Sequence, residues 1–346
     1  MATKRKPTKK RVDLLLRNSE VQTYKACRQQ WNWAYGMNLK SKRPRPALEI
    51  GSTIHTGMEH WYIPGKKRGV HPAKTVAAIY YEGLKSGAHK EIYVRPDDND
   101  DVDGESGDRV EIVDLMVEMM NNYVERWGKD EELEVIAPEQ TFQVDVYDED
   151  TRLYLFTACG QIDAVVRNRR TKQIGYLEHK TGAGLTPFGA PEPLDEQSGM
   201  YWTYGPTWLK ATGQIKESDE VDFIIFNRMR KGFRDKRPAN SLGQHLNKDG
   251  TVSKKQPPPL FARSVVQRSE HDQWILDQRM RSVAKEMLMI QRGELDIYKS
   301  PNRHCGYCEF RDMCEVHETG SDWEAILHAG FVGWLPYEDH VGKPHV

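Results

Sequence analysis

The chain has 346 residues, enough at roughly 150 residues per domain for one large domain or two. Hydrophobic residues make up 38% and charged residues 29% of the chain, and the charge-free stretch among the aromatic residues, 197–209, falls short of the roughly 18 residues that a membrane span requires. Formal net charge is -1, which excludes a globally basic DNA-coating protein. No apolar segment follows the basic first residues, so we expect no secretory signal.

Cysteine usage indicates the cellular compartment, and the charge distribution indicates candidate binding surfaces. The five cysteines are an odd number in a 40.0 kDa chain, so we expect a cytoplasmic, intracellular protein rather than a disulfide framework. Residues 97–105 carry six acids and no base, whereas residues 228–255 carry nine Lys or Arg against Asp235 and Asp249. Each run can be a solvated loop. The basic run can instead be a surface that binds the phosphates of a nucleic acid.

The first third of the chain predicts helices. Ser19 to Gln22 has the form of a capping box and predicts a helix to about Tyr35, ended by Gly36. Residues 40–49 predict a proline-broken linker. Further helices are expected over about 51–61 and over 108–127. Between them, residues 62–106 predict an irregular insertion that contains a helix over about 73–84.

Strands dominate the middle of the chain. Alternating or continuous apolar runs rich in β-branched and aromatic residues predict strands over 140–147, 153–166 and 173–180, followed by a helix over about 195–210 and a strand over 221–227. Residues 232–260 predict a long loop and 269–291 a last long helix. This order predicts a mixed α/β core.

Two carboxylates and a lysine stand on neighbouring predicted strands. Asp163 lies on one strand and Glu178 on the next, fifteen residues later. Adjacent strands lie about 4.8 Å apart, so the two acids can share a metal ion. Lys180 is two residues beyond Glu178 and projects from the same face. Such a set suits metal-assisted hydrolysis of a phosphodiester, but as an isolated pattern it is weakly specific.

Four short patterns occur together and in order. They are Gly51-xxx-His55-xxx-Glu59, Gly160-xx-Asp163, Glu178-x-Lys180 and Gln197-xxx-Tyr201. In this combination the chain, over roughly residues 18–318, resembles the PD-(D/E)XK nuclease superfamily, specifically the RecB-like branch that includes AddB-type nucleases and CRISPR-associated RecB-like exonucleases. The resemblance implies a restriction-endonuclease-like α/β core, a mixed sheet flanked by helices.

The resemblance also implies residue roles. His55, Asp163 and Glu178 would hold Mg²⁺ or Mn²⁺, with the imidazole favouring Mn²⁺. Lys180 would be the catalytic lysine, acting with Asp163 and Glu178, and Gln197 and Tyr201 would orient the site or contact DNA. Basic residues near the site, Arg228, Arg230 and Lys231, are further candidates for DNA binding.

Four cysteines form a second candidate site. Cys305, Cys308 and Cys314 have the spacing C-x₂-C-x₅-C, and Cys27 is a candidate fourth ligand. Four thiolates suit either a [4Fe–4S] cluster or structural zinc, and spacing leaves both open. The RecB-like resemblance implies the iron–sulfur cluster, which would tie residue 27 to residue 305. Cys159 matches no motif and is expected to be a small buried residue.

These interpretations predict the domain organisation. We expect a basic tail (1–17), an iron–sulfur helical subdomain made of the N- and C-terminal parts (18–50 and 270–318), a nuclease core (51–228) with the insertion at about 62–106, a basic proline-rich loop (229–262) and a C-terminal cap (319–346).

The expected function is a metal-dependent DNA exonuclease acting on linear single strands or duplex ends, in DNA recombination, repair or processing. A structure-specific endonuclease of the same superfamily and a non-catalytic iron–sulfur DNA-binding adaptor are the alternatives. The absence of a G-x-x-x-x-G-K-[ST] loop means that a motor would be a separate helicase or recombination partner. Oligomeric state and digestion polarity are not readable from the sequence.

Overall fold

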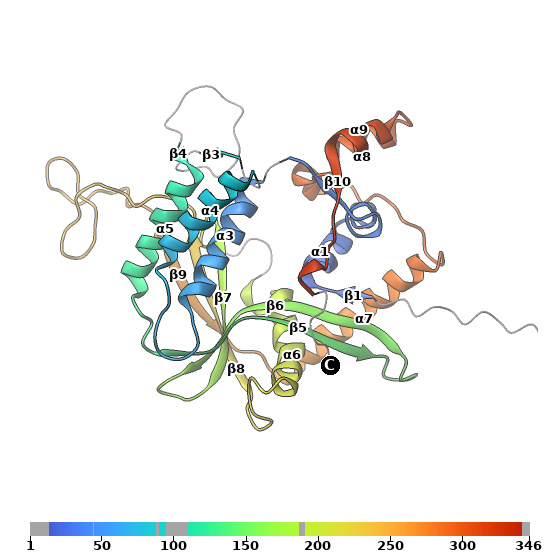
Figure 1. Ribbon diagram of the computed structural model, residues 1–346, viewed down its shortest axis with the longest axis horizontal. Helices are drawn as coiled ribbons and strands as arrows, with labels where there is room; N and C mark the ends of the chain where they lie inside the picture. Colours follow the sequence, from blue (N-terminus) through green and yellow to red (C-terminus); the bar gives the residue numbers. More distant parts are fainter. Residues whose placement is uncertain (1–13, 44, 88–89, 95–109, 187–190, 341–346) are drawn as a thin grey trace, which may run out of the picture.

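The computed structural model describes residues 14–43, 45–87, 90–94, 110–186 and 191–340 (Figure 1). Most of the expected basic tail and the acidic run at 97–105 lie outside these described residues. In the part of the chain that is described, no helix is both long enough and apolar enough to cross a membrane.

A six-stranded mixed sheet forms the centre of the molecule. Its strands are β1 (Leu15–Leu16), β5 (Leu133–Tyr147), β6 (Tyr154–Asn168), β7 (Ile174–Gly182), β8 (Val221–Arg230) and β9 (Phe261–Val266). The path is β1-β6-β7-β8-β9, and β5 pairs with the other edge of β6. The pairs β1–β6 and β7–β8 are parallel and the others antiparallel. The long β6 therefore contacts β1 with its first half and β7 with its second.

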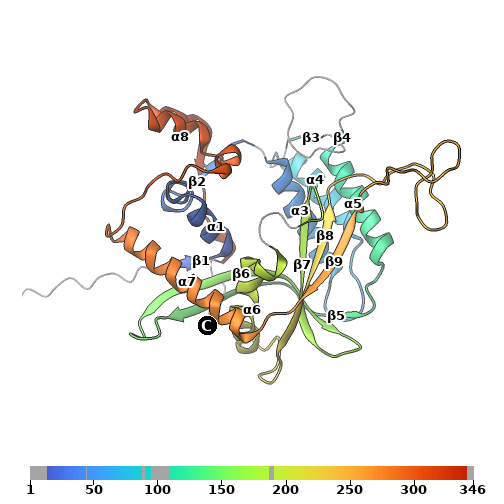
Figure 2. The same cartoon turned by 180° about the vertical axis from the view of Figure 1, so that it is seen from behind.

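Two groups of helices cover the two faces of this sheet (Figures 1 and 2). On one face lie α3 (Pro46–Trp61), α4 (Pro72–Ser86) and α5 (Ile112–Trp127), which pack on one another and on buried side chains such as Leu177. On the other face lie α6 (Glu196–Ala211) and α7 (Glu270–Gln291), packed on side chains such as Tyr176. Neighbouring strand residues thus enter different cores, as a two-sided buried sheet requires.

The observed order α5, β5, β6, β7, α6, β8 confirms the predicted mixed α/β core, and 231–260 is a loop with only isolated bridges. The helix expected over about 73–84 is confirmed as α4 (Pro72–Ser86). Its Val76 and Tyr80 are 0% and 1% exposed, so this part of the expected insertion belongs to the core. Strand β9 was not predicted, because its polar and apolar residues, most of them half-buried, follow no clear alternation.

Two expected helix boundaries were wrong. The linker expected over 40–49 ends early, because α3 already begins at Pro46, whose fixed φ suits the first turn of a helix. The helix expected over 19–35 is interrupted: α1 (Asn18–Ala26) stops at Cys27, whose backbone is extended (φ -163°), and α2 (Arg28–Trp31) and a π-helical turn (Asn32–Gly36) follow. Cys27 therefore lies between the two helices and not within either of them.

The N- and C-terminal parts of the chain pack together beside the sheet (Figure 1). A small antiparallel pair joins β2 (Leu39–Ser41) to β10 (Phe331–Gly333), next to α8 (Arg311–Glu318) and α9 (Trp323–Gly330). A separate small core of five buried residues lies under them: Trp33, Ala34, Phe310, Met313 and Phe331. Five further short elements occur in the described chain: β3 (Tyr93–Val94) paired with β4 (Val110–Glu111), and 3₁₀ turns at Glu192–Leu194, Arg303–Tyr307 and Glu338–His340.

Candidate active site

His55 and Asp163 meet although 108 residues separate them. His55 comes from α3 and Asp163 from β6, and Nδ1 of His55 lies 3.0 Å from Oδ1 of Asp163. The second oxygen of Asp163 accepts the backbone N–H of His179, at 2.7 Å. Burial disfavours the charged form of each group, but the attraction between the two opposite charges is stronger. As a result the pKa of Asp163 falls below its ordinary value, and the pKa of His55 rises to about 9. The two groups thus stabilise each other as an ion pair.

Glu178 is the most deeply buried carboxylate of the group. Its side chain lies on β7, and the residue is 1% exposed. Burial, together with the charge of Asp163, raises the pKa of Glu178 to about 7, against the opposing effect of Lys180. Oε1 of Glu178 lies 2.8 Å from Nζ of Lys180, whereas the buried Oε2 has no hydrogen-bond partner among the residues that the structure describes. An unpartnered buried carboxylate oxygen is costly, and a bound cation would satisfy it.

Lys180, Gln197 and Tyr201 form a chain of hydrogen bonds. Nζ of Lys180 donates to Oε1 of Gln197 at 2.6 Å, and Nε2 of Gln197 donates to the Tyr201 hydroxyl at 2.6 Å. Burial lowers the pKa of Lys180, but the carboxylates of Glu178 and Asp195 outweigh this and the net pKa rises. The ammonium therefore remains charged beside Glu178.

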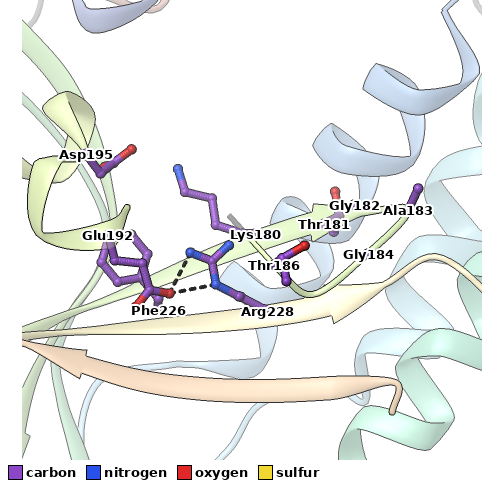
Figure 3. A pocket seen from close by; sticks show the side chains of 10 residues that line it. All are labelled: Lys180, Thr181, Gly182, Ala183, Gly184, Thr186, Glu192, Asp195, Phe226 and Arg228. Carbon is purple, nitrogen blue, oxygen red and sulfur yellow. Dashed lines mark hydrogen bonds and ion pairs between the residues drawn. The ribbon is translucent and has the colours of Figure 1, made fainter. Parts of the chain in front are cut away.

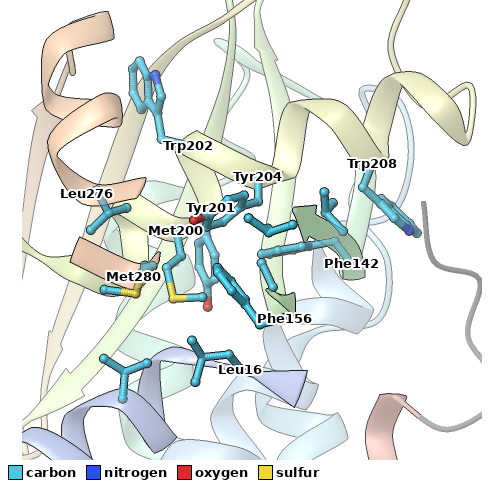
Figure 4. Packing of buried hydrophobic residues seen from close by; sticks show 14 of the residues in the cluster. Leu16, Phe142, Phe156, Met200, Tyr201, Trp202, Tyr204, Trp208, Leu276 and Met280 are labelled. Atoms are coloured by element: carbon cyan, nitrogen blue, oxygen red, sulfur yellow. The ribbon is translucent and has the colours of Figure 1, made fainter. Parts of the chain in front are cut away.

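Helix α6 brings Gln197 and Tyr201 to this position. Asp195 caps the helix by accepting the N–H of Ser198 at 2.8 Å, so Gln197 stands in the first turn and Tyr201 one turn later on the same face. Tyr201 and Phe142 belong to the buried core that packs on this face of the sheet (Figure 4). A Cβ on Gly160 of β6 would come within 2.4 Å of Phe142 and 2.9 Å of Tyr201. Glycine in the Gly160-xx-Asp163 pattern thus allows the helix to approach the strand.

Two further acidic residues surround the pair of His55 and Asp163. Glu139 on β5 stands opposite Asp163, since its neighbours pair with residues 164 and 162. Burial raises the pKa of Glu139, and the charges of Glu59 and Asp163 raise it further. The sequence patterns include Glu59 without assigning it a role. Glu139 matches no pattern and is identified only by the pairing of β5 with β6.

A buried polar network lies behind the site and was not predicted. Nδ2 of Asn227 donates to Nδ1 of His179 at 2.8 Å, and Nε of Arg263 donates to Oδ1 of Asn227 at 3.0 Å. Arg263 also forms a bidentate ion pair with Asp130, in which each carboxylate oxygen lies 2.6 Å from a guanidinium nitrogen. Burial lowers the pKa of His179 to about 3, so the imidazole is neutral and Nδ1 accepts. The network holds the strand segment whose N–H binds Asp163.

The three basic residues singled out for DNA binding are engaged within the protein. Arg228 pairs with Glu192, with its Nη2 2.6 Å from Oε1. Lys231 is 6% exposed, and its Nζ donates to the carbonyl of Ala47 at 2.8 Å. Nε of Arg230 donates to the carbonyl of Pro259 at 3.3 Å. These side chains support the structure around the end of β8.

A cavity of about 510 Å³ opens beside Lys180 (Figure 3). Its walls come from the end of β7 and the residues after it (180–184 and Thr186), from Glu192 and Asp195, and from Phe226 and Arg228 on β8. The cavity adjoins Lys180, whose Nζ lies 2.8 Å from Oε1 of Glu178. Such a volume is typical of a ligand-binding cleft.

Electrostatic influence connects the three cysteines of the C-x₂-C-x₅-C pattern with Cys27. Backbone N–H groups of Ser300 and Asn302 lie 3.4 Å from the sulfur atoms of Cys27 and Cys305, respectively. Burial raises the pKa of the Cys308 thiol to about 11, and the neighbouring thiolates of Cys27, Cys314 and Cys305 raise it further. Cys159 is 1% exposed on β6, as expected of a buried residue. None of the five forms a disulfide.

Neither cluster has the geometry of an assembled metal centre. Among the described residues, no group of three or more His, Cys, Asp or Glu side chains converges as metal ligands do. The donor types fit nonetheless. One imidazole and two carboxylates, one with an unpartnered buried oxygen, suit Mg²⁺ or Mn²⁺, and four thiols suit iron–sulfur or zinc.

Comparison with known proteins agrees with the geometry of the carboxylate site. The family model of the PD-(D/E)XK nuclease superfamily matches residues 18–315, which is most of the 346-residue chain. The match includes the helices and strands that carry His55, Asp163, Glu178 and Lys180. A search among curated proteins finds no significant match. From the extent of the family match and the mixed sheet flanked by helices, we conclude that the chain belongs to the PD-(D/E)XK nuclease superfamily.

Proposed function

We propose that this nuclease is a metal-dependent DNA exonuclease that hydrolyses phosphodiester bonds at the ends of linear single-stranded or duplex DNA. The observation that carries the metal site is the buried, unpartnered Oε2 of Glu178 beside the ion pair of His55 and Asp163. The RecB-like pattern of Gln197 and Tyr201 supports the exonuclease assignment, with a place in DNA recombination, repair or processing. DNA is the proposed partner, and a helicase or recombination protein could deliver it.

His55, Asp163 and Glu178 would hold the cation. Bound there, Mg²⁺ or Mn²⁺ would polarise the phosphate and lower the pKa of a water molecule. In the described structure His55 and Asp163 bind each other at 3.0 Å. Ligation therefore requires their hydrogen bond to be replaced and the imidazole to lose its extra proton, so cation binding competes with protons.

Lys180 supplies positive charge next to the reacting phosphate. Its ammonium is held between Glu178 Oε1 and Gln197 Oε1, at 2.8 Å and 2.6 Å, and borders the cavity. A fixed ammonium stabilises the charge that develops on phosphate oxygens in the transition state and orients the attacking water. Gln197 and Tyr201 position Lys180 through the hydrogen-bond chain described above.

Digestion of end-labelled linear single-stranded DNA beside a circular single strand, each with Mn²⁺ or Mg²⁺, tests the function. We expect the linear strand to be shortened, the circle to survive, and the Lys180→Ala and Asp163→Ala proteins to be inactive. A nicked circle would show an endonuclease instead. If the wild-type protein with its cofactors bound cuts neither substrate, the non-catalytic DNA-binding adaptor becomes the better description.

We further propose that Cys27, Cys305, Cys308 and Cys314 hold a [4Fe–4S] cluster that ties the N- and C-terminal parts together. The all-thiol donor set and the mutual electrostatic influence of the thiols support this proposal. Protein purified without oxygen should contain about four iron and four sulfide ions per chain and should absorb visible light. Cys27→Ser should lose both, whereas Cys159→Ser should retain them. Zinc without iron would contradict the proposal.

A further inference from the structure

A long arm leaves the body of the molecule between the last two strands of the sheet. We define the arm as residues 231–260, which connect β8 to β9. Figures 1 and 2 both show it extending well beyond the helices and the sheet. Its chain is long enough to reach far from the body, since an extended chain spans about 3.3 Å per residue.

The base of the arm is attached directly to the strand that carries Glu178 and Lys180. The N–H of Lys231 donates to the carbonyl of Gly182, two residues after Lys180, at 2.8 Å. The N–H of Arg230 donates to the carbonyl of Leu260 at 2.8 Å, which closes the base. The buried Lys231 side chain then ties the base to α3 through Ala47. The arm therefore starts at the same end of the sheet as the cavity.

Hydrogen bonds within the arm give it a defined shape. Isolated β-bridges join Ala239 to His245 and Leu246 to Val252. The N–H of His245 donates to Oε1 of Gln256 at 2.8 Å, and the N–H of Asn247 donates to the carbonyl of Thr251 at 2.8 Å. These turns present the outer side chains at reproducible positions rather than along a random coil.

Positive charge is concentrated on the arm, and its outer part is not neutralised. The arm contains seven Lys or Arg and two Asp, a formal charge of +5 in a chain whose net charge is -1. Arg234 pairs with Glu125 and Arg237 with Asp235. The remaining exposed cations have no ion-pair partner among the described residues: Lys236, Lys248, Lys254 and Lys255.

We propose that this arm binds the phosphate backbone of the DNA that flanks the cleavage site, without reading its sequence. The proposal rests on the nuclease function proposed above. A duplex carries one charge per about 1.7 Å of its axis, so an arm of this length passes several phosphates. Lysine acts there as a mobile point charge, which suits backbone contact rather than base recognition. The arm would favour substrates long enough to extend from the cavity along its surface.

Salt-dependent binding tests the proposal. The variant replaces Lys236, Lys248, Lys254 and Lys255 by Gln, in a Lys180→Ala background that prevents cleavage. Its binding is measured with two end-labelled duplexes, one too short to reach the arm and one long enough to reach it. For the long duplex we expect affinity to fall at least about tenfold and the slope of log affinity against log salt to become shallower by about 0.9 for each lysine in contact. Binding of the short duplex should not change.

Two matched variants separate position from charge. Replacing four lysines elsewhere on the surface by Gln (Lys66, Lys129, Lys172 and Lys216) changes the net charge equally and should leave the salt slope for the long duplex near that of the wild type. Replacing the four arm lysines by Arg should retain binding. When Lys180 is retained, the variant with the four arm lysines replaced by Gln should have the wild-type kcat on the short duplex and a raised KM on the long duplex. Its melting temperature should equal that of the wild type.

Each contrary result has one meaning. An arm variant that keeps the wild-type salt slope and the wild-type KM on the long duplex overturns the arm proposal while the nuclease function stands. A wild-type protein that cuts neither the short nor the long duplex, nor linear single strands, overturns the proposed function and with it the arm proposal.

Discussion

Gln197 links the proposed catalytic lysine to a buried tyrosine. It accepts from Nζ of Lys180 and donates to the hydroxyl of Tyr201, each at 2.6 Å, so both ends of its amide are used. The amide orientation follows from this pattern, because Lys180 can only donate. Glu178 holds the ammonium from the other side, and the lysine has little freedom to move toward solvent.

Removing the amide should reduce catalysis more than binding. For Gln197→Ala we expect kcat to fall by about 10- to 100-fold, the range found when partners that orient a reacting group are removed, with little change in KM. Tyr201→Phe should have a smaller effect, because Gln197 keeps its bond to Lys180. Steady-state kinetics on linear DNA measure both variants. Ala at the exposed Gln173 is the control, and a Gln197→Ala enzyme with wild-type kcat would contradict the role given to Gln197.

At the scale of elements, helix α4 lies in a segment that was expected to be an insertion, yet it is part of the core. Pro72 occupies its first turn and His71 caps it, with Nδ1 accepting the N–H of Ala73 at 3.3 Å. The helix then packs between α3 and α5, which themselves cover β7. The stability of α4 therefore bears on the position of α3, which carries His55.

The cap makes the stability of this helix depend on pH. Burial, and then the charge of Lys74, lower the pKa of His71. As pH falls below the unfolded value of about 6.5, the unfolded chain binds the proton first, so the stabilisation present at neutral pH is lost. A protonated Nδ1 also cannot accept from Ala73.

We expect His71→Asn, which keeps a cap acceptor but does not titrate, to remove part of the loss of stability between about pH 7 and pH 5. The difference should be at most about 1 kcal/mol in the free energy of unfolding, measured by urea denaturation. His71→Ala should lose about 1 kcal/mol at neutral pH as well. Equal pH slopes in the wild type and His71→Asn would rule out His71 as the source.

On the scale of the whole molecule, the two ends of the chain form one unit beside the sheet. Phe331 of β10 stacks on Phe310, with ring centroids 5.0 Å apart and an interplanar angle of 4°. Nε1 of Trp334 donates to the carbonyl of Ala34 at 2.9 Å, and β10 pairs with β2. Residues 331–334 therefore hold Ala34 and β2, which follow Cys27 in the sequence.

This small core should open independently of the sheet. Phe331→Ala removes a side chain from a site where Phe331 is 8% and Phe310 is 0% exposed, which costs about 3 to 5 kcal/mol in buried positions. Amide hydrogen exchange should accelerate in β2 and β10 while β6 and β7 keep their protection. Val332→Ala, at a residue 44% exposed, is the control. Acceleration throughout the sheet would show that the two parts unfold together.

Local sequence patterns determined much of this protein. The alternation of apolar residues predicted the three central strands, and helices were expected over 108–127 and about 195–210, where α5 and α6 lie. The spacing of Glu178 and Lys180 placed two side chains on one strand face, because that spacing depends only on the period of a strand. The four motifs also indicated the family that the comparison later showed.

Only the tertiary structure decided which residues meet. Glu139 is opposite Asp163 through strand register, and Asn227 and Arg263 reach His179 through the pairing of β7, β8 and β9. The same is true of Arg228 and Lys231, whose charges looked free in the sequence but are engaged by Glu192 and Ala47. A side chain's partner depends on long-range packing, which a single sequence does not encode locally. The period of a helix or strand is a property of the backbone, and for that reason it could be read directly.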